Sequence, residues 1–278
     1  MSRIEKAMER AAQLRKGVAP ITAPDPILRE AQPVHIPPPL KCVEERITAE
    51  NPLLVTLNDP LSPAAEEFRK LKSTLVNLTK EGNFKNTLLV TSAVPNEGKS
   101  ITALNLAISL AQEINSTVLL VDADMRRPSI HRYLDIPNGQ GVSDCLRGSV
   151  EVGQVILATG IGRLSVITAG SDVKNPVELV TSQKMQEFIE ELKLRYVDRY
   201  VIIDAPPVLP FAETRTLGRL VDGVLFVIKE RLASQRNIHD ALDALSGCEL
   251  IGAVYNDTAI DLHDEHYSYY RSYATDRQ

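Results

Sequence analysis

The chain has 278 residues, 44% of them hydrophobic, which is enough to bury one sizeable core. Its formal net charge of −5 and its pI near 5.6 provide no basic field for a nucleic acid, so charge argues against DNA binding. Cys42, Cys145 and Cys248 show neither a zinc-ligand spacing nor a disulfide framework, and no run approaches the ~18 to 20 apolar residues that cross a bilayer.

Residues 1–17 form the first expected element, an amphipathic helix. The segment RIEKAMERAAQLRK places its apolar residues on one stripe and its charges on the other faces. This helix is either a solvated tail or a docking element for a partner, and the sequence favours neither. Residues 18–60 follow as a linker and lead-in, because prolines remove backbone donors and favour extended conformations.

Residues 61–257 are expected to form the main domain. The segment LSPAAEEFRKLKSTLVNL predicts its first helix, with Ser62 as the cap and Pro63 in the first turn. Continuous apolar strands then alternate with amphipathic helices, which indicates an α/β fold with a mainly parallel, doubly wound sheet flanked by helices. The composition changes at residues 258–278, which we expect to form a separate tyrosine-rich tail.

A phosphate-binding loop follows the strand TLLVTS and opens a helix, in the pattern Ala93-x4-Gly98-Lys99-Ser100. The pattern has Ala93 where a strict Walker A motif has glycine, and a small residue still lets the loop close. Such a loop predicts a P-loop NTPase in which Lys99 reaches the β- and γ-phosphates of ATP and the Ser100 hydroxyl coordinates Mg²⁺. The residues expected to bind the nucleotide are Asn96, Glu97, Gly98, Lys99, Ser100 and Ile101.

Two apolar strands end in carboxylates: VLLVDAD provides Asp122 and Asp124, and YVIIDAPP provides Asp204. In a parallel sheet these ends gather at the edge where ligands bind. A single aspartate at such a position is usually a helix cap. Beside a P-loop, three of them indicate a Mg²⁺ site together with Ser100, and a group that orients or deprotonates an attacking hydroxyl.

These motifs resemble those of the bacterial tyrosine kinases of exopolysaccharide export, the BY-kinases. AVPNEGKS is similar to their Walker A motif, VLLVDADMRRPSIH to their Walker A′ and VIIDAPPV to their Walker B, and the resemblance covers roughly Leu61 to Asn256. It implies an ATP-dependent protein-tyrosine kinase. Related ATPases that position division sites carry a lysine near the start of the loop, where this chain has Val94, and this absence favours the kinase.

The resemblance also assigns a role to the first helix of the domain, where BY-kinases use Glu-x2-Arg-x2-Arg to close a ring of subunits. Here the row is Glu66, Arg69 and Lys72, and lysine lacks the planar fork that binds a carboxylate through two hydrogen bonds. The alternative is a solvated helix face. A second departure is FAET at 211–214, where the family tends to carry an aspartate, and nothing in the sequence explains it.

The C-terminal tail holds half of the chain's eight tyrosines, without an apolar period that would bury them. Alone, such a tail is typical of a segment that adheres to a partner; beside a BY-kinase-like site it becomes the expected autophosphorylation cluster. The tyrosines are Tyr267, Tyr269, Tyr270 and Tyr273, and a neighbouring subunit would phosphorylate them in trans. The expected catalytic residues are Lys99, Asp122, Asp124 and Asp204.

The spacing does not decide which aspartate is the base. Either Asp122 or Asp124 orients or deprotonates the phenol, while Asp204 holds the metal or its water. Asn256 resembles the residue that contacts the nucleotide base in related ATPases, although a strand-end asparagine also caps turns.

The resemblance implies a homo-oligomer, a ring among the options, that regulates exopolysaccharide synthesis and export at exopolysaccharide or exosortase loci. It implies a membrane-bound polysaccharide co-polymerase as adaptor, a cognate tyrosine phosphatase, no nucleic acid, and a cytoplasmic protein held at the inner face of the plasma membrane through its partner. The alternative is a positioning-type ATPase switch that binds a membrane partner without tyrosine phosphorylation. Phosphotyrosine on the purified protein would discriminate between them.

Overall fold

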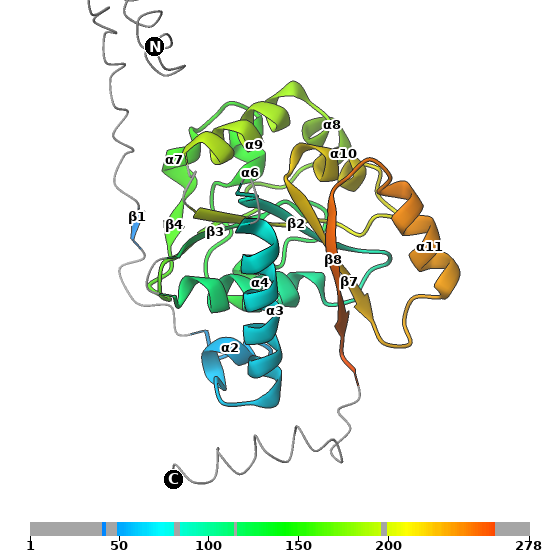
Figure 1. The fold of residues 1–278 in the computed structure, drawn as a ribbon. Coiled ribbons are helices and arrows are strands. Elements are labelled where there is room, and N and C mark those ends of the chain that lie inside the picture. The colour runs from blue at the N-terminus through cyan, green and yellow to red at the C-terminus, as the bar shows by residue number, and fades with distance from the viewer. Residues whose placement is uncertain (1–40, 43–48, 81–83, 114–115, 196–198, 259–278) are drawn as a thin grey trace, which may run out of the picture. The chain divides into compact units, whose positions relative to one another are not determined.

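An eight-stranded sheet in the order β1-β4-β5-β3-β6-β2-β7-β8 forms the centre of the described part of the chain (Figure 1). Neighbouring strands are parallel except for β4 and β5. The strands are β1 (Lys41–Cys42), β2 (Thr87–Ser92), β3 (Thr117–Asp122), β4 (Leu157–Ala158), β5 (Leu164–Ile167), β6 (Arg199–Asp204), β7 (Gly223–Lys229) and β8 (Leu250–Asn256). The central strands are apolar without alternation because helices cover both faces.

The computed structural model describes residues 41–42, 49–80, 84–113, 116–195 and 199–258. All of them belong to one compact unit, Pro38–Gln278. The expected N-terminal helix, most of the linker and the tail tyrosines lie outside these residues. Within them, no helix is both long enough and apolar enough to span a bilayer.

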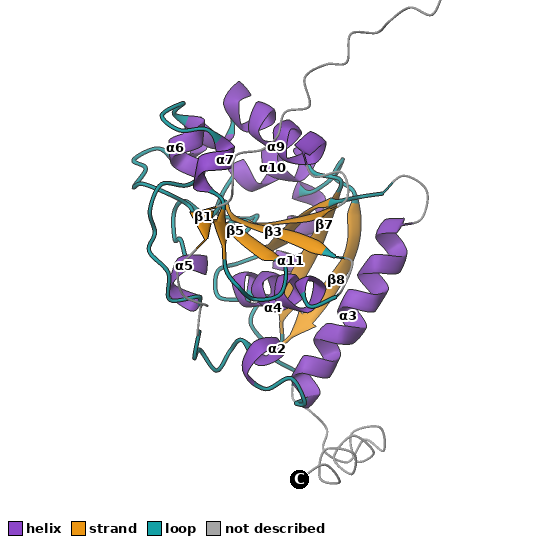
Figure 2. Cartoon of the chain, turned by 90° about the vertical axis from the view of Figure 1, so that its left-hand side faces the viewer, coloured by secondary structure: helices purple, strands orange, loops and turns teal. Residues whose placement is uncertain are grey.

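Two layers of helices cover the sheet, one on each face (Figure 2). The first layer packs on the core face that includes Leu88 and Val118; it consists of α2 (Val55–Asn58), α3 (Pro63–Lys80), α4 (Lys99–Ala111) and α5 (Ile130–Tyr133). The opposite layer consists of α6 (Val142–Leu146), α7 (Val152–Val155), α8 (Pro176–Val180), α9 (Gln183–Arg195), α10 (Glu213–Leu220) and α11 (Gln235–Ala244). This arrangement confirms the predicted doubly wound α/β fold.

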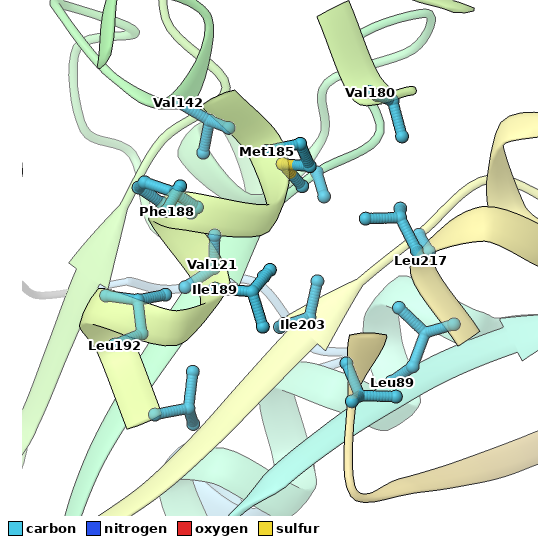
Figure 3. Close-up of a cluster of buried hydrophobic side chains, with 14 of the residues drawn as sticks. Leu89, Val121, Val142, Val180, Met185, Phe188, Ile189, Leu192, Ile203 and Leu217 are labelled. Carbon is cyan, nitrogen blue, oxygen red and sulfur yellow. The ribbon is translucent and has the colours of Figure 1, made fainter. Parts of the chain in front are cut away.

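The α9 helix shows how the second layer is held. Its residues Met185, Phe188, Ile189 and Leu192 recur at helical spacing, and all four are buried. They point toward Val121 and the neighbouring strand β6 (Figure 3). Each such side chain stabilises the fold by about 1.5–3 kcal/mol through burial, so this face fixes the strands that end in the aspartates.

A buried polar contact attaches the segment before α3 to the helix that begins at the P-loop. Asn105, in the middle of α4, is fully buried and accepts hydrogen bonds from the Thr56 backbone N–H at 3.0 Å and from its hydroxyl at 2.9 Å. Its amide donates to the Leu53 carbonyl at 2.8 Å. Residues 49–58 thus pack on the domain, although they fall within the range expected to be linker and lead-in.

We expect Asn105→Ala to lower the free energy of unfolding by about 3 kcal/mol, because it leaves the buried Thr56 N–H without an acceptor and removes the shorter of the two contacts of the Thr56 hydroxyl. Urea denaturation measures this change. Thr102→Val on the same helix is the matched control, since the Thr102 hydroxyl is buried without a hydrogen-bond partner in the described part of the chain and its removal should cost nothing. Equal destabilisation by the two variants would contradict the proposed contribution of the Thr56 contact.

Candidate active site

The loop between β2 and α4 has the backbone geometry that a phosphate-binding loop requires. Gly98 has φ of +88°, and a Cβ there would lie 2.1 Å from the Asn256 amide nitrogen, so only glycine fits. That amide donates to the Glu97 carbonyl at 2.9 Å. Asn256, expected to contact the nucleotide base, therefore uses its side-chain amide to hold the loop.

The Glu97 side chain stabilises the loop through hydrogen bonds to backbone N–H groups. Its side chain is fully buried; one oxygen accepts the Val94 N–H at 2.8 Å and the other the Lys229 N–H of β7 at 3.4 Å. The carboxylate thus turns away from the cleft, and Asn96, Gly98 and Ile101 line the cleft instead. Sequence reasoning placed Glu97 among the nucleotide-binding residues without anticipating that its side chain is buried in the loop.

Lys99 lies between two of the predicted carboxylates. Its ammonium is 2.8 Å from Asp124 Oδ2, 3.7 Å from Asp204 Oδ1 and 3.2 Å from the Ser100 hydroxyl. Burial disfavours the charged ammonium, but Asp204 and Asp124 outweigh that effect and raise the pKa of Lys99. The structure thus brings together four of the predicted site residues at one end of the sheet.

Asp204 has the properties of a metal ligand. It is fully buried, and neither carboxylate oxygen has a hydrogen-bond partner among the described residues. Burial raises its pKa, while the nearby Lys99 ammonium and Ser100 hydroxyl act in the opposite direction. The described residues contain no cage of three or more acidic, histidine or cysteine ligands, but Mg²⁺ usually needs only one or two carboxylates besides phosphate oxygens and water. Asp204 and Ser100 therefore fit this ion.

Asp122 instead organises the loop that follows β3. It pairs with Asp204 in the register of the two strands, but its oxygens accept the backbone N–H groups of Asp124 at 3.2 Å, Ser129 at 3.0 Å and Ile130 at 3.1 Å. Burial, reinforced by Asp204, raises the pKa of Asp122 to about 8. Of the two aspartates left open as the base, Asp124 is the one that lines the cleft.

The pKa of Asp122 predicts that stability falls as pH rises from about 4 to about 8. In that window the folded protein keeps a proton that the unfolded chain has released, and each such proton changes the free energy of unfolding by up to about 1.4 kcal/mol per pH unit. Urea denaturation at several pH values should show a flatter dependence for Asp122→Asn, whatever its absolute stability. Parallel curves for the two proteins would contradict the raised pKa.

A cleft of about 900 Å³ opens beside this site, lined by the P-loop, by Asp124 and by the residues that follow it. At its wall the Arg126 Nε donates to Glu213 at 2.6 Å, and the guanidinium lies 4.5 Å from the centre of the Phe211 ring. Glu213 is buried. This contact explains the FAET segment: its glutamate and phenylalanine hold an arginine of the Walker A′ stretch.

The three residues expected at a subunit interface make contacts within the chain. On α3, Arg69 pairs with Glu66 and also donates to the Pro60 carbonyl. Lys72 lies 2.9 Å from Glu113, just beyond α4, and this contact lowers the pKa of Glu113. The expected autophosphorylation tyrosines lie outside the described residues.

Comparisons with known proteins place this geometry in a family. Residues 96–246 match the family model described as "AAA domain". Tyrosine-protein kinase YwqD of Bacillus subtilis is 33% identical over 219 residues, which cover 78% of this chain and 90% of the relative.

Solved structures agree. The kinase domain of Escherichia coli tyrosine kinase ETK is similar with a TM-score of 0.68 and 30% identity, over 74% of this chain and 82% of that one. The septum site-determining protein MinD of Pyrococcus horikoshii, solved with Mg-ADP, has a TM-score of 0.54 and 19% identity over 66% of this chain and 76% of that one, which shows a shared fold alone. With its P-loop, its cleft aspartate and these relatives, the chain belongs to the bacterial tyrosine-protein kinases.

Proposed function

We propose that this tyrosine kinase transfers the γ-phosphoryl group of Mg·ATP to the tyrosines of its own C-terminal tail, from one subunit to the next. The observation that carries the proposal is the convergence of Lys99, Asp124 and Asp204 at the mouth of a P-loop, in a chain of the tyrosine kinase family. The groups that accept the phosphoryl group are the phenols of Tyr267, Tyr269, Tyr270 and Tyr273. A phenol has a pKa near 10, so it needs a positioned base to react at neutral pH.

Each site residue then has a distinct task. The Lys99 ammonium neutralises the charge that develops on the transferred phosphoryl group. Ser100 and Asp204 would hold Mg²⁺, which would supply electrostatic stabilisation of the phosphate charge. Asp124 takes the proton of the incoming phenol. Asp122 keeps Asp124 in place through the backbone of the loop, and the loop and helix amides from Asn96 to Ile101 bind the phosphates.

The wider role follows from the family resemblance. The kinase would act on exopolysaccharide synthesis and export as a homo-oligomer, with a membrane-bound co-polymerase as its adaptor and a cognate phosphatase as its antagonist. It would then lie in the cytoplasm at the inner face of the plasma membrane. All three residues of the expected interface are already paired within the chain, Lys72 with Glu113 and Arg69 with Glu66, so ring closure would have to exchange these contacts for contacts with a neighbouring subunit.

The proposal is tested by mass spectrometry of the tail after incubation of the full chain with Mg·ATP. We expect phosphate on tyrosines between 267 and 273, and none in a variant carrying Tyr→Phe at the four positions. The test is repeated with cytoplasmic segments of candidate adaptors. ATP hydrolysis without any phosphotyrosine in either condition would favour the switch ATPase and refute the autokinase.

Transfer in trans has a separate test. A Lys99→Met protein with its tail intact is mixed with a protein that has an intact site and the four Tyr→Phe substitutions. We expect phosphate on the tail of the Lys99→Met subunit, which mass spectrometry distinguishes by its sequence. Wild-type phosphorylation combined with an unmodified tail in this mixture would show that transfer occurs within one subunit.

A further inference from the structure

The outer part of the cleft carries positive charge that the phosphate site does not use. Arg127, His131 and Arg132 line the same cleft of about 900 Å³ as Lys99 and Asp124. They come directly after the Walker A′ aspartates in the sequence. Both arginines are exposed, so their side chains are accessible from solvent.

Backbone hydrogen bonds hold these arginines in a fixed relation to the site. The Arg127 N–H donates to Asp124 Oδ1 at 3.0 Å. The short helix α5, which carries Arg132, begins where Ser129 and Ile130 donate to Asp122 Oδ2. A group bound by the arginines would therefore lie close to Asp124, within the reach of the two side chains.

The charges of these two arginines are not matched within the described part of the chain. No acidic side chain there forms an ion pair with Arg127 or Arg132, whereas the neighbouring Arg126 is paired with Glu213. Asp172 also lines the cleft, and its backbone carbonyl accepts a hydrogen bond from Arg147 at 2.8 Å. Burial, followed by the effect of Arg132, lowers the pKa of His131, so at neutral pH the positive charge belongs to the arginines.

The sequence of the tail is complementary to this surface. Asp261, Asp264 and Glu265 lie within the six residues that precede Tyr267. We infer that Arg127 and Arg132 form a subsite for these acidic residues of the acceptor tail, so that binding of Asp264 and Glu265 directs the first tyrosine to Asp124. This inference rests on the proposed function and names the part of the substrate that gives specificity. Paired guanidinium and carboxylate groups form charge-assisted hydrogen bonds that recognise such a peptide.

The subsite is tested with peptides as acceptors. The enzyme is the full chain with Tyr→Phe at the four tail positions, so that it cannot modify itself. The native peptide, residues 258–278, is compared with one carrying Asp261→Asn, Asp264→Asn and Glu265→Gln. We expect the KM for the neutralised peptide to rise about tenfold with little change in kcat, since each exposed ion pair contributes modestly to binding.

The reciprocal change is made on the enzyme. Arg132→Glu should raise the KM for the native peptide by a similar factor, and a peptide with Asp264→Lys and Glu265→Lys should recover binding to this variant. Arg236→Glu on α11, where the side chain is 89% exposed, is the matched control and should leave both constants unchanged. The KM for ATP should be unaffected by Arg132→Glu, because the P-loop binds the phosphates.

Three results would overturn the inference. One is equal KM values for the native and neutralised peptides while tyrosines are still phosphorylated, which would leave the autokinase intact. Another is a rise of the KM for ATP alone in Arg132→Glu, which would assign the arginines to the nucleotide. Anisotropy of a labelled tail peptide measures binding without chemistry, so equal affinity of wild type and Arg132→Glu would refute the subsite even if no phosphate were transferred.

Discussion

Replacement of Lys99 by methionine should lower tyrosine phosphorylation by about a thousandfold, the size expected when a group that stabilises developing charge is removed from a water-poor site. Methionine has nearly the volume of lysine, so the packing beneath the loop is preserved. The substitution removes the ammonium that lies 2.8 Å from Asp124 and 3.7 Å from Asp204. Among the described residues, no other cation pairs with these two carboxylates. Phosphotyrosine formed with Mg·ATP, quantified by mass spectrometry at early times, measures the effect.

One further variant tests whether the geometry of the charge at position 99 matters, and a second is the control. Lys99→Arg keeps a positive charge but presents a planar fork, so we expect it to remain strongly impaired. Lys85→Met is the control, because Lys85 pairs with the exposed Glu249 away from the cleft, and its loss should not change activity. More than a tenth of wild-type activity in Lys99→Met would contradict the assigned role.

Loss of Lys99 should also change stability in a pH-dependent way. Without the ammonium, Asp124 and Asp204 keep their negative charges in a buried place without a counter-ion, which disfavours the folded state when both are ionised. We expect Lys99→Met to be closer to wild type in stability at pH 5 than at pH 8, as measured by thermal unfolding without nucleotide. A separation that is the same at both pH values would argue against electrostatic coupling of the three groups.

The features that could be predicted from the sequence are those that depend on which elements follow one another along the chain. A strand, a tight loop and a helix follow one another from Thr87 to Ala111, so the P-loop could be recognised from one short stretch. The ends of parallel strands share one edge, and this rule together with the P-loop motif was enough to predict that Lys99, Asp124 and Asp204 come together. Topology and motif thus account for the centre of the site.

The features that were missed depend on contacts between distant residues. Arg126 and Glu213 are 87 residues apart, and Thr56 and Asn105 are 49 apart, so neither pair leaves a periodic signal in the sequence. The FAET departure was the signal for the first pair, but it could be interpreted only once its partner was known. The direction of a side chain could not be predicted from the sequence either. Asp122 resembles Asp124 in sequence context, yet its oxygens accept hydrogen bonds from backbone N–H groups.

Asp204→Asn should abolish kinase activity without loss of stability. Asparagine keeps the shape but removes the charge and one of the oxygens available to Mg²⁺, so we expect phosphorylation to fall by about a hundredfold or more. In the nucleotide-free protein the same change removes a buried carboxylate whose oxygens have no hydrogen-bond partner among the described residues. Burying a carboxylate that makes no hydrogen bond is costly, and the Lys99 ammonium at 3.7 Å offsets only part of that cost, so the variant should unfold at the same temperature as wild type or at a higher one.

The two measurements on Asp204→Asn separate a functional residue from a structural one. If Asp204 mainly held the fold together through its contact with Lys99 at 3.7 Å, its replacement would lower the unfolding temperature as well as the activity. If it is retained as a metal ligand, activity falls while stability does not, and Mg²⁺ dependence of nucleotide binding, measured by calorimetry, weakens in parallel. Asp222→Asn is the control, since Asp222 pairs with Lys193 at 2.7 Å in a half-buried ion pair outside the cleft. Loss of this pair should lower stability and leave the Mg²⁺ dependence of nucleotide binding unchanged. Burial of Asp204 disfavours the free protein, but a carboxylate whose oxygens accept no hydrogen bond from the described residues keeps those oxygens available to the ion.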